Sequence, residues 1–357
     1  MATIGIAGAG LLGRLLAWRL TRAGHRVTVF DPAAGPAPVF DGRDAAAFTA
    51  AGMLSPVAEL ENASPSVARL GLRSIVLWRQ IVAALPGSPF FAERGSLLLA
   101  HRSDLGAAER ILARLSQAGQ FGIVAEPLTE ARLHALETAL CGVARAWFLA
   151  GEAHIDPVGV MAALYEAAAG ATWRFGAGVV RVMPRALRIP DQGWQHFDTV
   201  FDVRGAGARP DLPVRGVRGE TVWLHAPGLG LSRPLRLLHP RHRVYIVPRP
   251  GDVLIVGASE IESEDRSPVS LKSAVELMTA AHSVLPQLSE ARILRLDRNL
   301  RPALADHEPH SEIGDGLVRI NGLFRHGWLL APALVDDALA ATGLAQAPQA
   351  LPESTPL

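Results

Sequence analysis

Cysteine is almost absent from this 357-residue chain, which contains only Cys141. An internal disulfide is therefore excluded, and a reducing compartment such as the cytoplasm is expected. Because no basic residue stands beside Cys141, an inert thiol is favoured over a reactive one. Net charge is also nearly absent, with 35 Lys and Arg against 34 Asp and Glu, and the arginines are spread along the sequence. We therefore expect no nucleic-acid partner.

Long hydrophobic runs are missing as well. Even the apolar stretch 70–85 carries Arg73 and Arg79, so we expect no membrane-spanning helix and no membrane partner. No positively charged leader precedes the first apolar run, and we expect no signal peptide. The composition, 49% hydrophobic and 19% charged, is typical of a compact soluble protein, and the length suggests about two domains.

The first 31 residues are the stretch around which the chain is organised. A strand is predicted over 3–7, a helix over 11–23 and a second strand over 26–30, which ends at Asp31. The turn between the first strand and the helix reads Gly8-Ala9-Gly10-Leu11-Leu12-Gly13. This strand–turn–helix–strand unit, with GxGxxG in the turn, predicts a dinucleotide site.

Each part of this unit has a physical role. Gly8 makes the tight turn, Gly10 lets a pyrophosphate approach the backbone, and Gly13 lets the helix pack closely on the strand. The free N–H groups at the start of the helix attract phosphate. Asp31 can accept a hydrogen bond from a ribose hydroxyl and argues against the 2′-phosphate of NADP. The motif by itself does not decide between NAD, NADP and FAD.

Three further segments could approach a cofactor. The stretch 49–56 is unusually small and apolar for a loop, which fits either a packed turn or backbone passing close to a flat ring. A predicted strand over 199–203 runs into the glycine turn 204–208, and the loop 322–327 precedes a final helix over 328–342. Most elements from residue 216 to 300 are strands of period two, with a hairpin turn at Gly251-Asp252.

The order of these segments predicts the fold class and the domains. We expect an α/β (α+β) protein with a discontinuous Rossmann-like domain and a second, mostly antiparallel β domain. The nucleotide domain would comprise residues 1–56, 151–210 and 301–345, and the substrate domain would comprise 57–150 and 211–300. The Pro-, Ala- and Gln-rich tail 346–357 is expected to be disordered.

Several motifs along the chain carry a resemblance to a known family. They are Ala50-Ala51-Gly52-Met53-Leu54, Ile155-Asp156-Pro157, Arg218-Gly219-Glu220, residues 244–249 (VYIVPR), Val256-Gly257-Ala258-Ser259, Leu300-Arg301-Pro302 and residues 321–332 (NGLFRHGWLLAP). With the opening glycine turn, in this order and spacing, the chain resembles the D-amino-acid oxidase superfamily of flavoproteins over about residues 3–342. Within that superfamily it resembles the glycine oxidases of thiamine biosynthesis.

The resemblance implies a non-covalently bound FAD and a set of residues that hold it. The ADP half is expected at Gly8, Gly10, Leu11, Leu12, Gly13 and Asp31, with the adenine near Val179 or Val180. The flavin ring is expected at the small loop of Thr49, Ala50, Ala51, Gly52 and Met53 and at the region of Gly327. Further cofactor contacts are expected at Gly205, Gly322, His326, Trp328 and Leu329. The start of the last helix, at Gly327-Trp328, would present its positive dipole end to the flavin edge that becomes negative on reduction.

The resemblance also implies a substrate site. Arg301 is the position that pairs with the substrate carboxylate, and Tyr245 and Arg325 line the same pocket. A planar guanidinium can hold a carboxylate through two hydrogen bonds, which a lysine cannot. From the residues alone, Arg301 could be a structural ion pair, Tyr245 a core tyrosine and Arg325 a surface arginine.

Further pocket residues are expected at Met53, Arg243 and Glu260. Glu260 stands where several relatives carry an apolar residue, and Arg243 stands where some carry histidine. A glutamate in the pocket would reduce its size or add charge, and either effect favours a small amine.

No metal site is predicted. His239, His242, His307 and His310 have no neighbours in a known metal-ligand spacing, and no nucleophile-elbow motif for a serine hydrolase is present.

The expected activity is oxidative deamination of glycine or another small amino acid, with O2 reduced to H2O2. The resemblance also implies that this reaction serves the synthesis of the thiamine thiazole ring. A homo-oligomer is possible on the same ground. The alternatives are a dehydrogenase of the same fold that uses another electron acceptor, and a protein that binds NAD or a nucleotide without flavin chemistry.

Overall fold

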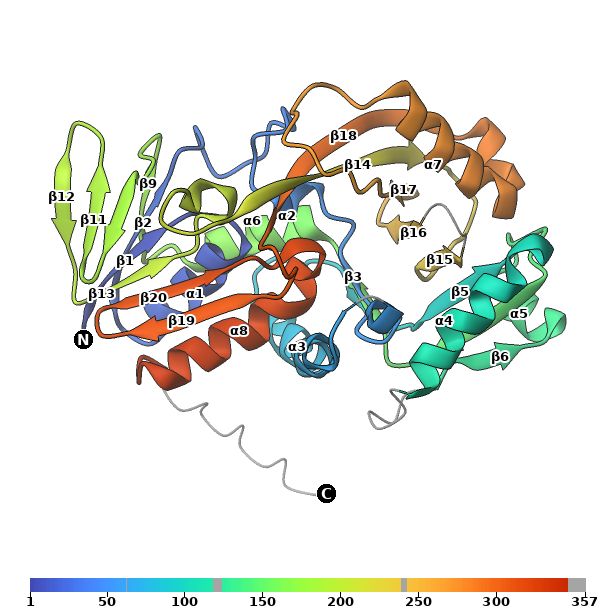
Figure 1. The fold of residues 1–357 in the computed structure, drawn as a ribbon, viewed down its shortest axis with the longest axis horizontal. Helices are drawn as coiled ribbons and strands as arrows, with labels where there is room; N and C mark the ends of the chain where they lie inside the picture. The colour runs from blue at the N-terminus through green and yellow to red at the C-terminus, as the bar shows by residue number, and fades with distance from the viewer. Residues whose placement is uncertain (62, 118–123, 239–242, 346–357) are drawn as a thin grey trace, which may run out of the picture.

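The computed structural model describes residues 1–61, 63–117, 124–238 and 243–345 (Figure 1). His239, His242 and the tail 346–357, for which the sequence predicts disorder, lie outside the described residues.

A six-stranded sheet contains the opening unit. Its strands are β1 (Thr3–Ala7), β2 (Arg26–Asp31), β9 (Thr172–Phe175), β13 (Thr199–Asp202), β19 (His310–Gly314) and β20 (Leu317–Asn321). Their spatial order is β19-β20-β13-β1-β2-β9. All neighbours are parallel except the antiparallel pair β19 and β20. The sheet therefore brings together segments from the beginning, the middle and the end of the chain.

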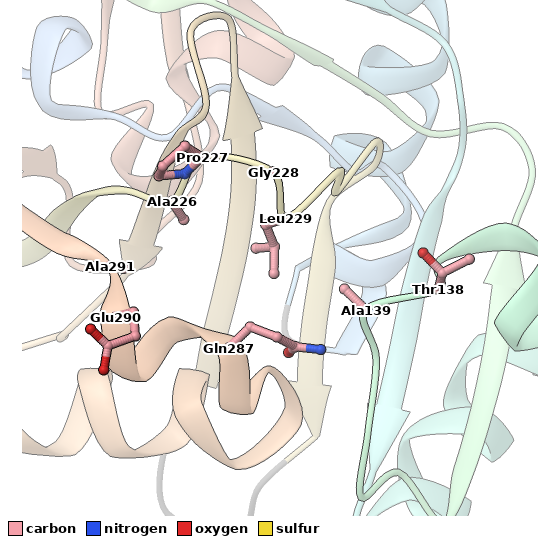
Figure 2. Close-up of a pocket in the computed structure, with 9 residues that line it drawn as sticks. All are labelled: Thr138, Ala139, Ala226, Pro227, Gly228, Leu229, Gln287, Glu290 and Ala291. Atoms are coloured by element: carbon pink, nitrogen blue, oxygen red, sulfur yellow. The ribbon is translucent and has the colours of Figure 1, made fainter.

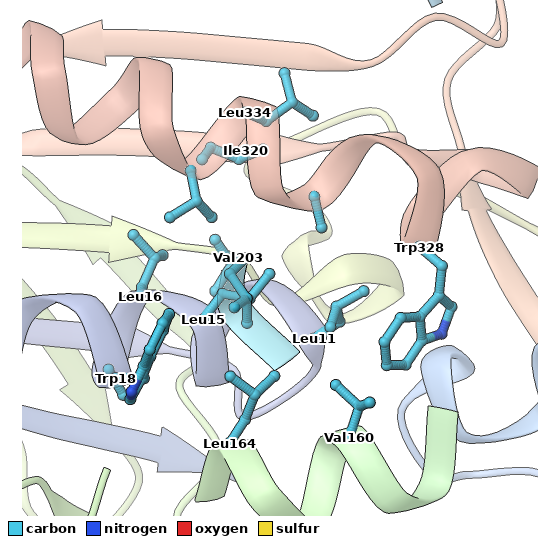
Figure 3. Close-up of a cluster of buried hydrophobic side chains, with 14 of the residues drawn as sticks. Leu11, Leu15, Leu16, Trp18, Val160, Leu164, Val203, Ile320, Trp328 and Leu334 are labelled. Carbon is cyan, nitrogen blue, oxygen red and sulfur yellow. The ribbon is translucent and has the colours of Figure 1, made fainter. Parts of the chain in front are cut away.

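Helices cover one face of this sheet. They are α1 (Leu11–Arg22), α3 (Pro65–Ala84), α6 (Pro157–Ala167) and α8 (Gly327–Ala341). Alternate strand residues such as Ile4, Ile6 and Ile320 point toward them, as the period of a strand requires. Figure 3 shows side chains of α1, α6 and α8 meeting in the resulting core. The opposite face packs on a small antiparallel sheet of β10 (Arg181–Met183), β11 (Ala186–Ile189) and β12 (Gly193–His196).

A second, eight-stranded sheet lies beside the first (Figure 1). Its strands, in spatial order, are β18 (Arg292–Ala303), β14 (Arg215–His225), β17 (Val253–Gly257), β16 (Arg243–Arg249), β15 (Leu235–Leu238), β5 (Ser96–Ala100), β7 (Arg145–Leu149) and β6 (Glu126–Leu128). Only the β15–β5 pair is parallel. Helices α4 (Leu105–Gln117), α5 (Glu130–Leu136) and α7 (Leu271–Val284) accompany it. The two sheets confirm the predicted fold class, a Rossmann-like parallel sheet with a mostly antiparallel second sheet.

Small elements lie between the two sheets. They are α2 (Ala46–Thr49), β3 (Met53–Leu54), β4 (Phe91–Ala92), β8 (Ala153–Ile155) and three 3₁₀ turns that recur below, η1 (Ala58–Glu61), η4 (Gly205–Ala208) and η6 (Phe324–His326). The 3₁₀ turn η2 (Arg102–Asp104) leads from β5 into α4. Another 3₁₀ turn, η5 (Pro286–Glu290), follows α7. Strand β8 pairs with both β3 and β4.

The sequence also predicts helices that begin behind Thr129 and Asp156, the first over 130–140, and a strand over 291–300 that ends before Arg301-Pro302. Thr129 caps α5, Asp156 caps α6, and the predicted hairpin at Gly251-Asp252 joins β16 to β17. Two of the ends are wrong. The strand continues to Ala303, because β18 is an edge strand and Pro302 needs no ladder partner on its outer side. The helix that begins at Glu130 ends at Leu136. The next residue, Glu137, is bound instead by the backbone N–H and hydroxyl of Ser232, a tertiary contact that sequence periodicity does not show.

Candidate active site

Arg301 lies on β18, opposite Val217 of β14. Its Nη1 donates to the carbonyl oxygens of Arg218 at 3.3 Å and of Ser259 at 3.1 Å. Among the residues that the structure describes, no Asp or Glu forms an ion pair with Arg301. Burial lowers the pKa of this guanidinium, although the nearby Tyr245 raises it. The site therefore contains a partly buried cation whose protein partners are neutral carbonyls.

Two glycines make room for the side chains of Arg301 and Tyr245. A Cβ at Gly219 of β14 would lie 2.4 Å from Cζ of Arg301, and a Cβ at Gly257 of β17 would lie 2.7 Å from the Tyr245 hydroxyl. Gly257 is the partner of Tyr245 on β16 and also of Thr221, two residues beyond Gly219. The two glycines therefore share one face of the sheet, and the guanidinium and the phenol lie over it together.

Arg325, on η6, is held by two carboxylates. Its Nη1 lies 3.1 Å from Oε2 of Glu260, and its Nη2 lies 3.5 Å from Glu59 on η1. Glu59 also binds Nη1 of Arg236 at 3.1 Å and lies 3.6 Å from Nδ1 of His326. The structure thus brings together Arg325 and Glu260, which were both predicted as pocket residues, and adds Glu59, which the sequence analysis did not identify.

Charges around Glu59 decide its ionisation. Burial raises its pKa, but Arg325 and Arg236 outweigh burial and hold that pKa well below the ordinary value of a glutamate. Burial also lowers the pKa of His326, although Glu59 acts in the opposite direction. Glu59 is therefore a permanent anion that joins η1, β15 and η6.

The other two predicted pocket residues are Met53 and Arg243. Met53, on β3, packs in one apolar group with Ala51 and Tyr245. Arg243 is the first residue of β16, opposite Leu238 of β15 and two positions before Tyr245.

The opening turn is shaped to receive a diphosphate. Gly8 has a φ of 108°, and a Cβ there would lie 2.7 Å from the Val203 carbonyl oxygen. A Cβ at Gly13 would lie 1.9 Å from the Gly8 carbonyl oxygen, so α1 and β1 approach as closely as only glycine permits. Gly10 has no contact closer than 3.6 Å at that position, and the N-terminus of α1 has neither a side-chain cap nor an acidic residue in its first turn. Its N–H groups are therefore available to an anion.

Two charged side chains bind the backbone of this turn at Ala9. Asp31 accepts hydrogen bonds from the backbone N–H groups of Ala9 at 2.6 Å and Ala33 at 2.8 Å. The buried Arg14 donates from Nε to the Ala9 carbonyl oxygen at 2.9 Å, and burial lowers its pKa to about 10. Arg14 was not predicted from the sequence. Asp31, predicted as a ribose ligand, also positions the phosphate-binding turn.

The other predicted adenosine-side residues lie around the same turn. Leu11 and Leu12 begin α1, with Leu11 buried in the helix–sheet core. Val179 is buried and Val180 is 46% exposed, in the segment after β9 that bonds back to Asp31 through Ala177. Gly205, a further predicted cofactor contact, begins η4 two residues after Val203, whose carbonyl oxygen Gly8 approaches, and the Gly205 carbonyl oxygen accepts from Asn321.

The small loop from Thr49 to Met53 is fixed by Arg249 at the end of β16. Nη2 of Arg249 donates to the carbonyl oxygens of Ala50 at 3.3 Å and Ala51 at 2.5 Å, and Nη1 donates to the carbonyl oxygen of Ile155. Gly52 has a φ of 73°, and a Cβ there would lie 2.2 Å from the Ile155 carbonyl oxygen. Thr49 accepts a hydrogen bond from Asn299 of β18. The loop is thus tied to the sheet that carries Arg301 and Tyr245.

The start of α8 lies against this loop. Trp328 donates from its indole to the Ala47 carbonyl oxygen at 3.0 Å, and its own carbonyl oxygen accepts from the indole of Trp78 at 2.7 Å. Leu329 packs against Gly71 of α3, while a Cβ at Gly327 would meet nothing within 4 Å. Gly322 turns the chain from β20 into η6 with a φ of 69°. The N-terminus of α8 is therefore fixed beside the small loop, with open space at its first residue.

Fold and site together define a flavin-dependent oxidoreductase, and comparison with known proteins agrees. Residues 3–339 match the family described as FAD dependent oxidoreductase (DAO), and the chain belongs to this family. It is an enzyme of the glycine oxidase-like type, and its cofactor is FAD.

Three relatives illustrate the match. The chain is 39% identical over 334 residues to a Rhizobium etli protein assigned as the thiamine biosynthesis oxidoreductase ThiO, covering 93% of this chain and 94% of that protein. It is 27% identical over 351 residues to the glycine oxidase of Bacillus licheniformis, covering 92% and 89%. The crystal structure of glycine oxidase from Geobacillus kaustophilus superposes with a TM-score of 0.82 at 24% identity, covering 98% and 96%, which shows the shared fold.

The residues present fit FAD. The glycine turn leaves at Gly10 the space that a diphosphate needs, and the free N-terminus of α1 faces that space. A flat ring fits beside the small loop and the open first residue of α8, where a larger side chain at Gly327 is absent. These residues would hold the cofactor between the two sheets.

Three further findings concern the described residues outside this site. A hollow of about 440 Å³, lined by residues 138–139, 226–229, 287 and 290–291, lies at the His225 end of β14 (Figure 2). Arg301 pairs near the other end of that strand, so the hollow is separate from the site. No described helix is long and apolar enough to cross a membrane. Within the described ranges, no three His, Cys, Asp or Glu side chains are grouped so that they could hold a metal ion.

Proposed function

We propose that the protein oxidises glycine or another small amino acid to the imine, with O2 as electron acceptor, and that it acts in thiamine biosynthesis. The observation that carries the proposal is Arg301, a partly buried cation bound by two neutral carbonyls and lying on one face of the sheet with Tyr245. Such a cation is suited to a carboxylate ligand, which supplies the missing negative charge through two hydrogen bonds.

The two sheets would divide the work. Residues 1–56, 151–210 and 301–345, which contain the six-stranded sheet with α1, α6 and α8, would carry FAD. Residues 57–150 and 211–300 would carry the substrate. When bound, FAD supplies the acceptor for a hydride equivalent, and O2 then takes the two electrons to give hydrogen peroxide.

The side chains of this chain would bind and orient the substrate. Arg301 holds the carboxylate, and Tyr245 donates a hydrogen bond to it, because burial raises the pKa of the Tyr245 hydroxyl and keeps it protonated. With the carboxylate fixed, the Cα–H is directed toward the cofactor, and this orientation supplies much of the rate. Met53 and Ala51 pack with Tyr245 in one apolar group and would form an apolar wall beside the substrate Cα.

The substrate amine must be neutral when the hydride leaves. The rate is therefore expected to rise with pH as the ammonium group of the substrate deprotonates, and the route needs no base from the protein. The product imine would hydrolyse to glyoxylate and ammonia, or pass on to synthesis of the thiazole ring. The names of the relatives, a ThiO oxidoreductase and a glycine oxidase, support this substrate and this pathway.

The test is peroxide release by the FAD-loaded protein with glycine, sarcosine and D-alanine. Peroxide from at least one of them is expected, with glycine preferred. Turnover with a dye in the absence of oxygen, and none with oxygen, would select the dehydrogenase alternative. A colourless protein that binds NAD in place of FAD, or no turnover with any acceptor, would reject the proposal.

A further inference from the structure

We propose that Glu260 is a specificity-determining residue that restricts the substrate to amino acids with a single carboxylate. In this role it occupies Arg325 and excludes a second substrate carboxylate from that arginine. The inference rests on the proposed amino-acid site and concerns only which acids enter it.

The two arginines of the pocket differ in their partners. Arg301 contacts two backbone carbonyls and, among the described residues, no carboxylate. Arg325 lies between two carboxylates, with Glu260 at 3.1 Å and Glu59 at 3.5 Å. Arg301 is therefore suited to a carboxylate of the substrate, while the charge of Arg325 is already balanced by carboxylates of the protein.

The two carboxylates on Arg325 also differ. Glu59 is 16% exposed and is shared by Arg236, Arg325 and His326, so it belongs to a buried network. Glu260 is 41% exposed and approaches Arg325 from the solvent side, and no other ion pair of Glu260 occurs among the described residues. Glu260 is the carboxylate that a substrate carboxylate would have to replace on Arg325. Replacing Glu59 instead would take the counter-ion from the buried Arg236.

The backbone places Glu260 between the two arginines. The carbonyl oxygen of the preceding residue, Ser259, accepts a hydrogen bond from Arg301, and the Ser259 hydroxyl donates one to the Glu220 carboxylate. The following Ile261 forms a two-bond antiparallel bridge with Arg218 of β14. A segment fixed on both sides therefore holds Glu260 in contact with Arg325 and close enough to Arg301 for its charge to act on that guanidinium.

A dicarboxylate amine meets this arrangement unfavourably. With one carboxylate on Arg301, its second carboxylate would have to reach Arg325, where Glu260 repels it and already accepts the hydrogen bond that Arg325 would donate to it. Glycine and other monocarboxylates make no such demand. Replacing Glu260 by neutral glutamine removes the repulsion and the carboxylate that competes with a substrate anion for Arg325.

The experiment compares glycine with iminodiacetate, which contains the same glycine unit plus a second carboxylate. The FAD-loaded wild type, Glu260→Gln and Glu262→Gln are assayed for peroxide release with both amines. Glu262 is a matched control on the same loop, exposed and paired with Arg215 on the protein surface. In Glu260→Gln, kcat/KM for iminodiacetate relative to glycine is expected to rise at least tenfold, and in Glu262→Gln this ratio is expected to stay within twofold of wild type.

A binding measurement keeps the inference separate from the proposed function. The oxidised, FAD-loaded proteins are titrated with glycolate and with malonate, and the flavin absorbance is followed. The Kd of malonate is expected to fall at least tenfold in Glu260→Gln, while that of glycolate changes less than threefold. A second variant, Glu260→Ala, is expected to behave in the same way and replaces Glu260→Gln if that protein does not retain flavin.

The outcomes are distinguishable. Wild-type turnover of glycine with an unchanged iminodiacetate ratio and an unchanged malonate Kd in both Glu260 variants would overturn the inference and leave the proposed function standing. The predicted change in malonate Kd without turnover of any amino acid would support Glu260 as the selector and overturn the proposed function.

Discussion

The guanidinium of Arg301 lies directly on Gly219 of the neighbouring strand, where a Cβ would stand 2.4 Å from its Cζ. No side chain other than hydrogen leaves space for it. Tyr245 and Gly257 repeat the relationship two strands away on the same face of the sheet. The absence of a side chain at Gly219 and Gly257 thus makes the space in which the proposed carboxylate-binding groups lie. A glycine inside a strand often marks such a close approach of another group to the backbone.

Gly219→Ala is expected to displace the guanidinium and weaken carboxylate binding. Loss of a charge-assisted hydrogen-bond pair corresponds to about 1.5–3 kcal/mol, so KM for glycine should rise by roughly tenfold to a hundredfold with FAD still bound. Steady-state kinetics checks this. Gly106→Ala, an ordinary helix position on α4, is the control and should leave KM unchanged. Equal KM values for Gly219→Ala and wild type would show that Arg301 does not act at that place.

Arg301→Lys retains the charge but removes the planar fork. A lysine ammonium cannot form the two parallel hydrogen bonds that a carboxylate accepts from a guanidinium. KM for glycine is expected to rise about tenfold or more, by the same scale of hydrogen-bond energies. Arg292→Lys, at the exposed start of the same strand, serves as the matched control. An unchanged KM in Arg301→Lys would remove the role assigned to Arg301.

Glu59→Gln is expected to destabilise the folded protein. Removing one member of a buried ion pair leaves its partners uncompensated and costs about 3–5 kcal/mol. Here Arg236 and Arg325 would lose a shared counter-ion. Thermal unfolding followed by circular dichroism should show a clearly lower Tm. Glu93→Gln, which breaks the surface pair with Arg79, should cost about 1 kcal/mol or less. A Glu59→Gln Tm equal to that of the Glu93 variant would contradict the assignment.

The pH dependence of stability should contain a contribution from His154. Its side chain is fully buried on β8 against Phe90, and burial together with the charge of Arg249 lowers its pKa to about 3. The unfolded chain, with an ordinary histidine pKa of 6.5, binds a proton between these values that the folded protein does not. The unfolding free energy therefore falls as pH falls from about 6.5 toward 3.

The variant His154→Gln isolates this contribution. Between pH 7 and pH 5 the wild type should lose about 2 kcal/mol more stability than His154→Gln, a figure that follows from the two pKa values. Denaturant unfolding at both pH values measures the difference. His196→Gln, at an exposed position of β12, should follow the wild type. Parallel curves for wild type and His154→Gln would mean that His154 is not held neutral by the fold.

Sequence reasoning located the parts of the site that local chemistry determines. The turn from Gly8 to Gly13 is encoded within six residues. Arg301, Tyr245 and Arg325 belong to short motifs, and in the structure the charges of both arginines act on the Tyr245 hydroxyl, so the three side chains lie near one another. Their roles in catalysis remain predictions that the variants above examine.

The parts that were missed depend on contacts between distant residues. Glu59 reaches Arg236 and Arg325 across 177 and 266 positions of the chain, and nothing in its own neighbourhood indicates those partners. Arg14 and Arg249 likewise bind backbone carbonyls of other segments, which have no sequence pattern. Gly219 and Gly257 did carry a signal, since each interrupts a strand, and this signal could have indicated the recess under Arg301 and Tyr245.

The most direct test of the central claim is an anaerobic titration of the FAD-loaded protein with glycine, read from the flavin absorbance. The account predicts that glycine bleaches the oxidised flavin band, and that admission of oxygen restores it with about one hydrogen peroxide per glycine consumed. A flavin spectrum that glycine, sarcosine and D-alanine all leave unchanged would contradict it.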